Sequence, residues 1–114
     1  AQKALTWAIP SLDDWRAANT AEILRRVTAF RNAFALLPGW RIDSIGAYFA
    51  YVAHPFTGVP VQMVAERLAS ERGVLGLPGP YFGTGQEQHM RLAFANVTVE
   101  SLGELPERLK NFTP

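Results

Sequence analysis

Cysteine is absent from this chain of 114 residues. Its absence excludes disulfides, thiolate zinc sites and thiol nucleophiles, and it is compatible with a reducing compartment, so we expect a cytoplasmic protein. Histidine is scarce too: the chain has only His54 and His89, and neither has the spacing to another ligand residue that metal-binding motifs show. We therefore expect no metal site.

Strong net charge and long apolar runs are also missing. The formal net charge is +1 at pH 7, which gives no electrostatic footprint for nucleic acid or for an anionic membrane surface. The apolar run over residues 4–9 is far too short to span a bilayer. An apolar content of 48% and a charged content of 18% instead suit one globular domain over residues 1–114.

Lysine occurs only as Lys3 and Lys110, both in helical patterns that suggest exposed positions. A lysine that forms a Schiff base needs a desolvated pocket and a cradle for the cofactor phosphate, and neither is visible here. The Gly-x-Ser-x-Gly elbow of hydrolases is absent as well. Residues 83–85, Gly-Thr-Gly, lack the third glycine and the following helix of a dinucleotide-binding fingerprint.

The N-terminal third of the chain is helical in pattern. Residues 1–9 are typical of the tail of a helix that Pro10 stops. Since the chain opens without Met inside this pattern, we expect a piece of a longer protein. Ser11 can cap the next helix, which should run to Leu36 and measure roughly 37 Å. A helix of this length suggests contact with a neighbouring domain. It can also be a long amphipathic cover for the sheet, and the two interpretations are compatible.

The remaining two thirds mix short strands with helices. Strands are expected over residues 40–43, 47–53, 74–77 and 90–95. Helices are expected from residue 61 to a stop at Gly73, and after Thr98 or Ser101, with a kink at Pro106. This order indicates an α/β two-layer sandwich, in which helices cover a short, mostly antiparallel sheet of three to four strands. The second strand is bulky on both faces, so helices or a partner should cover its far side.

The stretch from Leu77 to Asn96 is the most informative. It starts as a loop with a Pro-Gly-Pro breaker, two aromatic residues that include Phe82, and two glycines. Residues 90–95 then alternate with the period of a strand and put apolar side chains on one face. The other face carries Arg91, Ala93 and Ala95, and the small alanines leave space for a group that the Arg91 guanidinium can bind. The alternative is a strand with one arginine that extends its stem over a packed helix.

This stretch resembles fold-type I pyridoxal-phosphate (PLP) aminotransferases of the aspartate aminotransferase group. Those enzymes carry a Pro-Gly-x-x-Phe-Gly loop and then a strand whose arginine binds the α-carboxylate of the substrate. The matching positions are Pro78, Gly79, Phe82, Gly83 and Arg91. Residues 46–49, Gly-Ala-Tyr-Phe, are similar to a strand of the family, and the order of elements fits across most of the chain. The similarity covers only the small C-terminal domain, without the PLP-binding domain and its lysine.

The resemblance implies a parent enzyme that transfers an amino group between an amino acid and a 2-oxo acid, as a homodimer with PLP. This chain would lie against its own large PLP-binding domain. Arg91 would bind the substrate carboxylate, and Phe82 would belong to a lid that closes by domain movement. Alone, the chain is expected to hold no cofactor and to be inactive.

A second hypothesis is a stand-alone α/β module that binds a small ligand or another protein without catalysis. It accounts for the missing lysine site, but not for the incomplete N-terminus or for the loop and strand match. The role of Tyr48 stays open between core and site, and His89 is either an ordinary loop-end residue or part of the Arg91 cleft. An excised domain should also expose apolar side chains near its first helices, namely Leu5, Trp7, Ile9 and Trp15.

Overall fold

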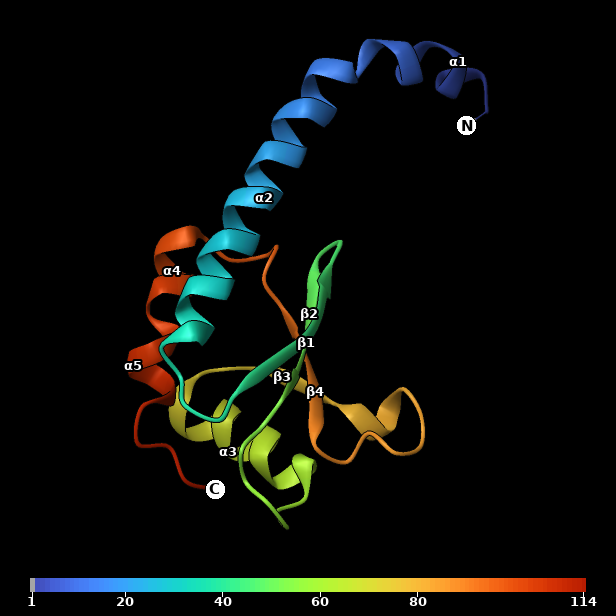
Figure 1. Cartoon of the computed structure of the whole chain (residues 1–114). Helices are drawn as coiled ribbons and strands as arrows, with labels where there is room; N and C mark the ends of the chain where they lie inside the picture. Colours follow the sequence, from blue (N-terminus) through green and yellow to red (C-terminus); the bar gives the residue numbers. More distant parts are fainter. Residues whose placement is uncertain (1) are drawn as a thin grey trace.

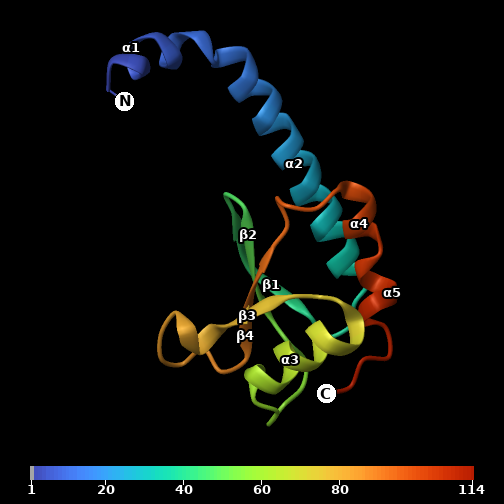
Figure 2. The ribbon, with the colours of Figure 1, turned by 180° about the vertical axis from the view of Figure 1, so that it is seen from behind.

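The computed structural model describes residues 2–114 as a layer of helices on one side of a sheet (Figure 1, Figure 2). Four strands form one antiparallel sheet in the order β1-β2-β4-β3. Their bounds are β1 (Arg41–Gly46), β2 (Phe49–Ala53), β3 (Gly76–Pro78) and β4 (His89–Ala93). The helices that cover it are α2 (Asp13–Ala35), α3 (Val61–Arg72), α4 (Val99–Gly103) and α5 (Leu105–Leu109). The expected two-layer sandwich with a long N-terminal helix is confirmed.

One hydrophobic core fills the space between the sheet and the helices. Alternate residues of β2 and β4 face it, and Met90 and Leu92 pair across the strands with Val52 and Ala50. Helical side chains meet them from α2, α3, α4 and α5: Phe30, Phe34, Val64, Leu68, Leu102 and Leu109. Each fully buried aliphatic or phenyl side chain contributes about 1.5–3 kcal/mol. The apolar face expected for residues 90–95 is therefore confirmed as a core face.

An arm made of α1 (Gln2–Ser11) and the first half of α2 projects from this body (Figure 1). No residue of α1 is buried, and the first fully buried residue of α2 is Phe30. The arm raises the radius of gyration to 16.8 Å, against about 13 Å for a compact domain of this size. Although α2 is long, no helix within residues 2–114 has both the length and the apolar character to cross a membrane.

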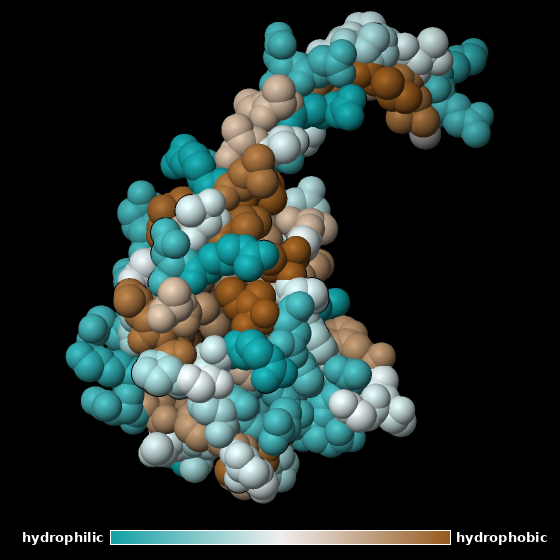
Figure 3. All heavy atoms as spheres, viewed as in Figure 1, coloured by the Kyte–Doolittle hydropathy of each residue, from teal (hydrophilic) through white to brown (hydrophobic). Residues whose placement is uncertain are grey.

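Apolar side chains lie along this arm without cover from the body (Figure 3). The four that the sequence predicted to be exposed are Leu5, Trp7, Ile9 and Trp15, and each is 54–70% exposed. Leu12 adds a fifth. The predicted exposure of these side chains is therefore confirmed. The surface of a monomeric protein normally avoids apolar residues gathered in one place.

The start of the long helix differs from the prediction. Pro10 lies inside α1, one residue before its end, so it removes a hydrogen bond only from the last turn. Ser11 does not cap α2: its hydroxyl donates back to the carbonyl of Trp7 at 2.7 Å, a bond that competes with capping. The residue before α2 is Leu12, which offers no side-chain cap.

The strand bounds also shift. Ala47, with φ of 48°, and Tyr48 form the turn between β1 and β2, so the second strand starts at Phe49. β3 begins at Gly76, two residues later than expected. β2 is not bulky and buried on both faces, as expected, but alternates: Phe49 is 40% exposed and Tyr51 is partly exposed, while Ala50 and Val52 are fully buried. The far face of the sheet therefore has no helix over it among residues 2–114.

The ends of the later helices follow the sequence signals. α3 ends at Gly73, whose left-handed φ of 64° suits glycine. Thr98 caps α4, because its side-chain oxygen accepts from the backbone N–H of Ser101 at 3.2 Å. The kink expected at Pro106 is a full break at Glu104 between α4 and α5, with the proline in the first turn of α5.

Candidate functional site

Arg91 lies in the middle of β4 and points to the face of the sheet that no helix covers. In the sheet it pairs with Tyr51 of β2 on one side and with Leu77 of β3 on the other. Its neighbours Met90 and Leu92 point into the core, so the strand alternation alone sends Arg91 outward. The side chain is half-buried.

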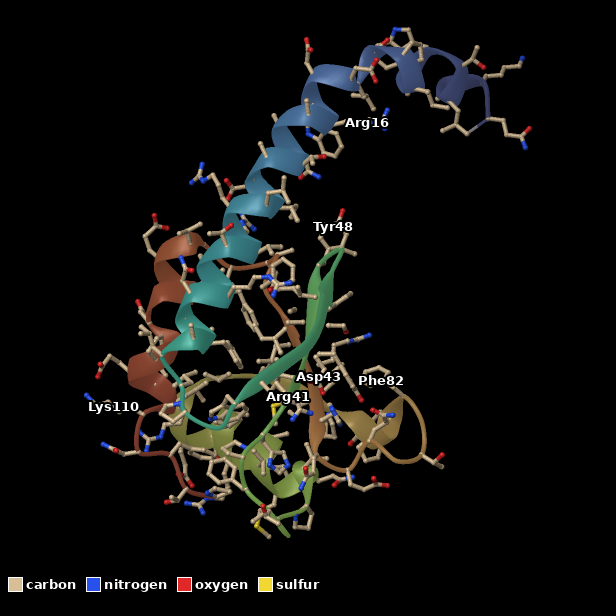
Figure 4. All side chains as sticks on the ribbon, viewed as in Figure 1. Arg16, Arg41, Asp43, Tyr48, Phe82 and Lys110 are labelled. Atoms are coloured by element: carbon tan, nitrogen blue, oxygen red, sulfur yellow. The ribbon has the colours of Figure 1, made fainter. Side chains whose placement is uncertain are left out.

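Two aromatic rings hold the guanidinium of Arg91. The ring centroids of Phe49 and Phe82 each lie 4.4 Å from its central carbon. Phe49 comes from β2, and Phe82 from the loop that follows the 3₁₀ turn η1 (Gly79–Tyr81), on the open side of the sheet (Figure 4). Stacked rings cover the face of a guanidinium and leave its in-plane N–H groups free for an acceptor. Among residues 2–114, no side chain or carbonyl accepts a hydrogen bond or salt bridge from Arg91.

An open pocket of about 570 Å³ lies beside this arginine. Eight residues line it: Ser44, Ile45, Gly46, Phe49, Tyr51, Phe82, Gln86 and Arg91. None of these lining residues is acidic, and Arg91 is the only charged residue among them. A pocket with one unpaired guanidinium and aromatic walls suits a small molecule that carries a carboxylate.

Tyr51 and Gln86 form the polar part of the wall. The Tyr51 hydroxyl donates to the side-chain Oε1 of Gln86 at 2.7 Å, which joins β2 to the loop that carries Phe82. Burial raises the pKa of Tyr51 above its usual value. The hydroxyl therefore keeps its proton at neutral pH and acts as a donor.

A hydrogen bond next to the pocket links β1 to β4. His89 Nε2 lies 2.7 Å from Asp43 Oδ2, and the ring of His89 stacks on that of Tyr51 at 5.0 Å between centroids. Asp43 also accepts from Arg41 on the same strand (Figure 4). The hydrogen bond from Arg41, then that from His89, lowers the pKa of Asp43 to about 2. His89 lies on the Arg91 face, as one of its two readings supposed, but it supports Tyr51 and does not line the pocket.

The other residues considered from the sequence lie apart from this pocket. Tyr48 is at the tip of the hairpin, half-exposed, beside a second open pocket between α2 and the end of β4 (Figure 4). His54 is buried, with Nδ1 accepting the backbone N–H of Phe56. Within residues 2–114, no three His, Asp or Glu side chains gather as a metal site would require.

Phe49, Tyr51 and Gln86 were not singled out from the sequence. Phe49 and Tyr51 stand two apart, as residues on one face of a strand do, and pairing with β4 puts them on the face of Arg91. That spacing was a usable signal, but the run of large residues around it hid the alternation. Gln86 carried no signal, because it reaches the pocket through the path of a loop.

Solved structures similar to this chain include several aminotransferases. The α-aminoadipate aminotransferase of Thermus thermophilus matches with a TM-score of 0.67 and 22% identity, over 94% of this chain and 28% of its own. The multiple substrate aminotransferase of Thermococcus profundus gives 0.63 and 26%, over 95% and 26%. The N-succinyldiaminopimelate aminotransferase of Mycobacterium tuberculosis gives 0.64 and 22%, over 95% and 29%.

These matches concern one part of much longer proteins, since this chain spans less than a third of each of the three. No protein-family model and no curated protein sequence matches the chain. The chain has the fold of the small domain of fold-type I PLP-dependent aminotransferases, so the resemblance recognised in its sequence is confirmed at the level of the fold.

Proposed function

We propose that this chain is the small C-terminal domain, residues 1–114, of a cytoplasmic PLP-dependent aminotransferase, in which Arg91 binds the carboxylate of the amino-acid and 2-oxo-acid substrates. The single observation that carries the proposal is the state of Arg91: half-buried, held by two rings, without an acidic partner among residues 2–114, and open to a pocket. The fold neighbours support it. One of them, from Thermus thermophilus, was solved with N-(5'-phosphopyridoxyl)-L-leucine, which joins a cofactor to an amino acid.

The chemistry of Arg91 suits a carboxylate better than other ligands. A guanidinium presents parallel N–H groups in one plane, and a carboxylate presents two oxygens at a matching separation. The two phenyl rings, each 4.4 Å from the central carbon of the guanidinium, limit its movement before the ligand arrives, so less conformational entropy is lost on binding. Because the pocket wall carries no acidic side chain, a substrate carboxylate would meet no repulsion there.

The residues of this chain do not fit PLP itself. Lys3 and Lys110 are both exposed, Lys110 approaches Glu107 at 3.8 Å, and neither lines the pocket of Arg91. A Schiff-base lysine needs a desolvated site, which these positions do not provide. The cofactor would belong to the large domain, and no chemical step is assigned to this chain. We therefore expect the chain alone to lack transaminase activity.

The uncovered face and the apolar arm support a large domain as the partner. The arm exposes Trp7 and Trp15, and the open face exposes Phe49 and Phe82. Exposed apolar patches mark contact surfaces, and aromatic side chains are enriched in interfaces. Phe82 lies on a loop at the rim of the pocket, where a lid between two domains would close, and a homodimer of the parent enzyme would complete the assembly.

The test is the kinetics of arginine variants in the full-length enzyme. Arg91→Ala should lower kcat/KM by roughly 10²–10⁴-fold, since loss of one partner of a desolvated ion pair costs about 3–5 kcal/mol. Arg91→Lys should fall between, because a point charge keeps the attraction but not the paired donors. Bound PLP should keep its absorption spectrum in both variants.

A matched control removes an arginine elsewhere on the surface. Arg67 pairs with Glu71 on the exposed side of α3, so Arg67→Ala should leave kcat/KM unchanged. Turnover that survives Arg91→Ala would contradict the carboxylate role. So would an Arg91→Ala enzyme whose lost activity is fully explained by loss of folded protein.

A further inference from the structure

Only one end of the Gln86 side-chain amide has a hydrogen-bond partner among residues 2–114. Its Oε1 accepts the hydroxyl proton of Tyr51 at 2.7 Å. Its Nε2, which carries two N–H donors, has no acceptor among residues 2–114. The side chain is half-buried and lines the same pocket as Arg91. A partly desolvated donor without an acceptor is costly unless a ligand or water supplies one.

The backbone of Gln86 is fixed on two sides. Its carbonyl accepts the N–H of His89 at 3.0 Å, so a tight turn precedes β4. Gly79 packs against it so closely that a Cβ on Gly79 would stand 2.3 Å from the Gln86 carbonyl oxygen. Only a glycine fits there without moving the loop. The position of Gln86 is therefore set by η1 and β4, the elements that also place Phe82 and Arg91.

The side chain of Gln86 is oriented as well. In the structure the Tyr51 hydroxyl donates to Oε1 of the amide, and this hydrogen bond turns Nε2 away from Tyr51. The ring of Tyr51 is held in turn by the stacked ring of His89, at an interplanar angle of 3°. His89 is hydrogen-bonded to Asp43, which lies on β1 on the other side of β2. This chain of contacts fixes which end of the amide faces the pocket.

We propose that Gln86 is a second carboxylate-binding residue of the pocket, whose Nε2 donates to the carboxylate that Arg91 holds, and that Tyr51 is the residue that positions it. The proposal rests on the proposed role of Arg91. A guanidinium can occupy one edge of a carboxylate, and each oxygen keeps a lone pair for a further donor. The amide supplies that donor without adding a second charge. Substrates with a free carboxylate would be selected over neutral analogues.

The experiment is an NMR titration of the 114-residue chain at pH 7 and constant ionic strength. Acetate serves as the carboxylate probe, and acetamide serves as its neutral counterpart. The Arg91 Nε–H and the Gln86 side-chain N–H signals are followed. Acetate should shift both along one saturable curve, while acetamide should shift neither by a comparable amount.

Four variants separate the roles. Gln86→Leu should weaken acetate binding about 10-fold, which is the effect expected for one hydrogen bond to a charged group. Gln86→Glu should weaken it further, because it adds a like charge. Tyr51→Phe should weaken it about 3-fold, with the amide signals of Gln86 shifted in the free protein. Gln88→Leu, the same change at an exposed glutamine outside the pocket, should have no effect.

The outcomes distinguish the two claims. If Arg91→Ala abolishes acetate binding while Gln86→Leu behaves like Gln88→Leu, Arg91 keeps its role and the proposal for Gln86 is wrong. If wild-type chain shows no saturable acetate shift, or if Arg91→Ala leaves it intact, the carboxylate role of Arg91 fails and that of Gln86 fails with it. Equal binding of acetamide and acetate would also overturn the proposal, since the site would then not distinguish a carboxylate from a neutral amide.

Discussion

The two faces of the sheet come from the same strands but meet different surroundings. On one face, Met90, Leu92 and Phe94 are at most 5% exposed under the helices. On the other, Arg91 and Phe49 lie one residue away from core positions and have no helix over them. The closed face is a conventional core. The open face combines exposed aromatic rings with a guanidinium that has no hydrogen-bond or salt-bridge partner among residues 2–114, and folding of this chain alone does not require either feature.

The long helix repeats the same contrast along its length. The C-terminal part of α2 buries Phe30, Ala33 and Phe34 against the sheet, whereas its N-terminal part and α1 bury nothing. Exposed apolar groups are unfavourable in water, so their presence in both places calls for a common reason. We infer that the closed face and the C-terminal part of α2 serve the stability of this domain, and that the open face and the arm serve its partner and ligand.

The largest expected effect is on the closed face. Phe94→Ala should lower the free energy of unfolding by about 3–5 kcal/mol, because it leaves a cavity where Phe94 meets Phe30. Phe49→Ala removes a phenyl ring of the same size from the open face and should cost about 1 kcal/mol, mainly the contact with Arg91. Urea unfolding of both variants measures the difference. Equal losses would contradict the division of roles between the faces.

A smaller effect on the free energy of unfolding is expected at Gly79, the first residue of η1. A Cβ there would press on the Gln86 carbonyl oxygen, so Gly79→Ala should cost about 1–3 kcal/mol and displace the loop. Acetate binding should weaken in the fraction that remains folded, because Phe82 and Gln86 move with the loop. Gly103→Ala is the matched control, since nothing lies within 4 Å of a Cβ at Gly103. An unperturbed Gly79→Ala protein would show that the loop adapts freely.

The smallest effect is the pH dependence that His54 contributes. Burial lowers the pKa of His54, more than the nearby Glu87 backbone raises it, and the charge of His89 lowers it a little further. The unfolded chain therefore takes up a proton at higher pH than the folded chain. Stability should fall as the pH drops below about 6.5, the ordinary pKa of histidine, until the folded-state pKa is passed.

Unfolding measured from pH 8 to pH 5 in wild type and in His54→Asn checks this dependence. The asparagine keeps an acceptor near the Phe56 N–H but does not titrate. Asp43, whose pKa is about 2, changes charge only well below this range. A decline of the same steepness in the variant would assign the dependence to other groups.

Much of this arrangement could be predicted from the sequence. The strand period of residues 90–95 predicted both the core face and the outward direction of Arg91, since that period is a property of the backbone. The break near Pro106 and the stop at Gly73 followed from the conformations those residues allow. The exposure of apolar side chains near the first helices was predicted from the expectation that the chain is one domain of a longer protein.

The polar wall of the pocket could not be predicted in the same way. The strand pairing of β1 with β2 shifts register between Ile42 and Ser44, which leaves Asp43 as an extra residue of a bulge. The bulge changes the direction of the Asp43 side chain, which contacts His89. The bond between Tyr51 and Gln86 joins residues 35 apart through the path of a loop. Neither contact leaves a periodic trace, because each depends on how distant segments meet in three dimensions.

If the chain is the small domain of a longer enzyme, as we propose, the rest of that enzyme covers the open face and the arm. Hydrogen–deuterium exchange, compared between the 114-residue chain and the same residues in the full-length enzyme, tests it most directly. Residues 5–15 and 82–88 should exchange several-fold more slowly in the full-length enzyme, while residues 90–94 on the closed core should exchange alike in both. Equal exchange of the arm and the loop in the two proteins would contradict the claim.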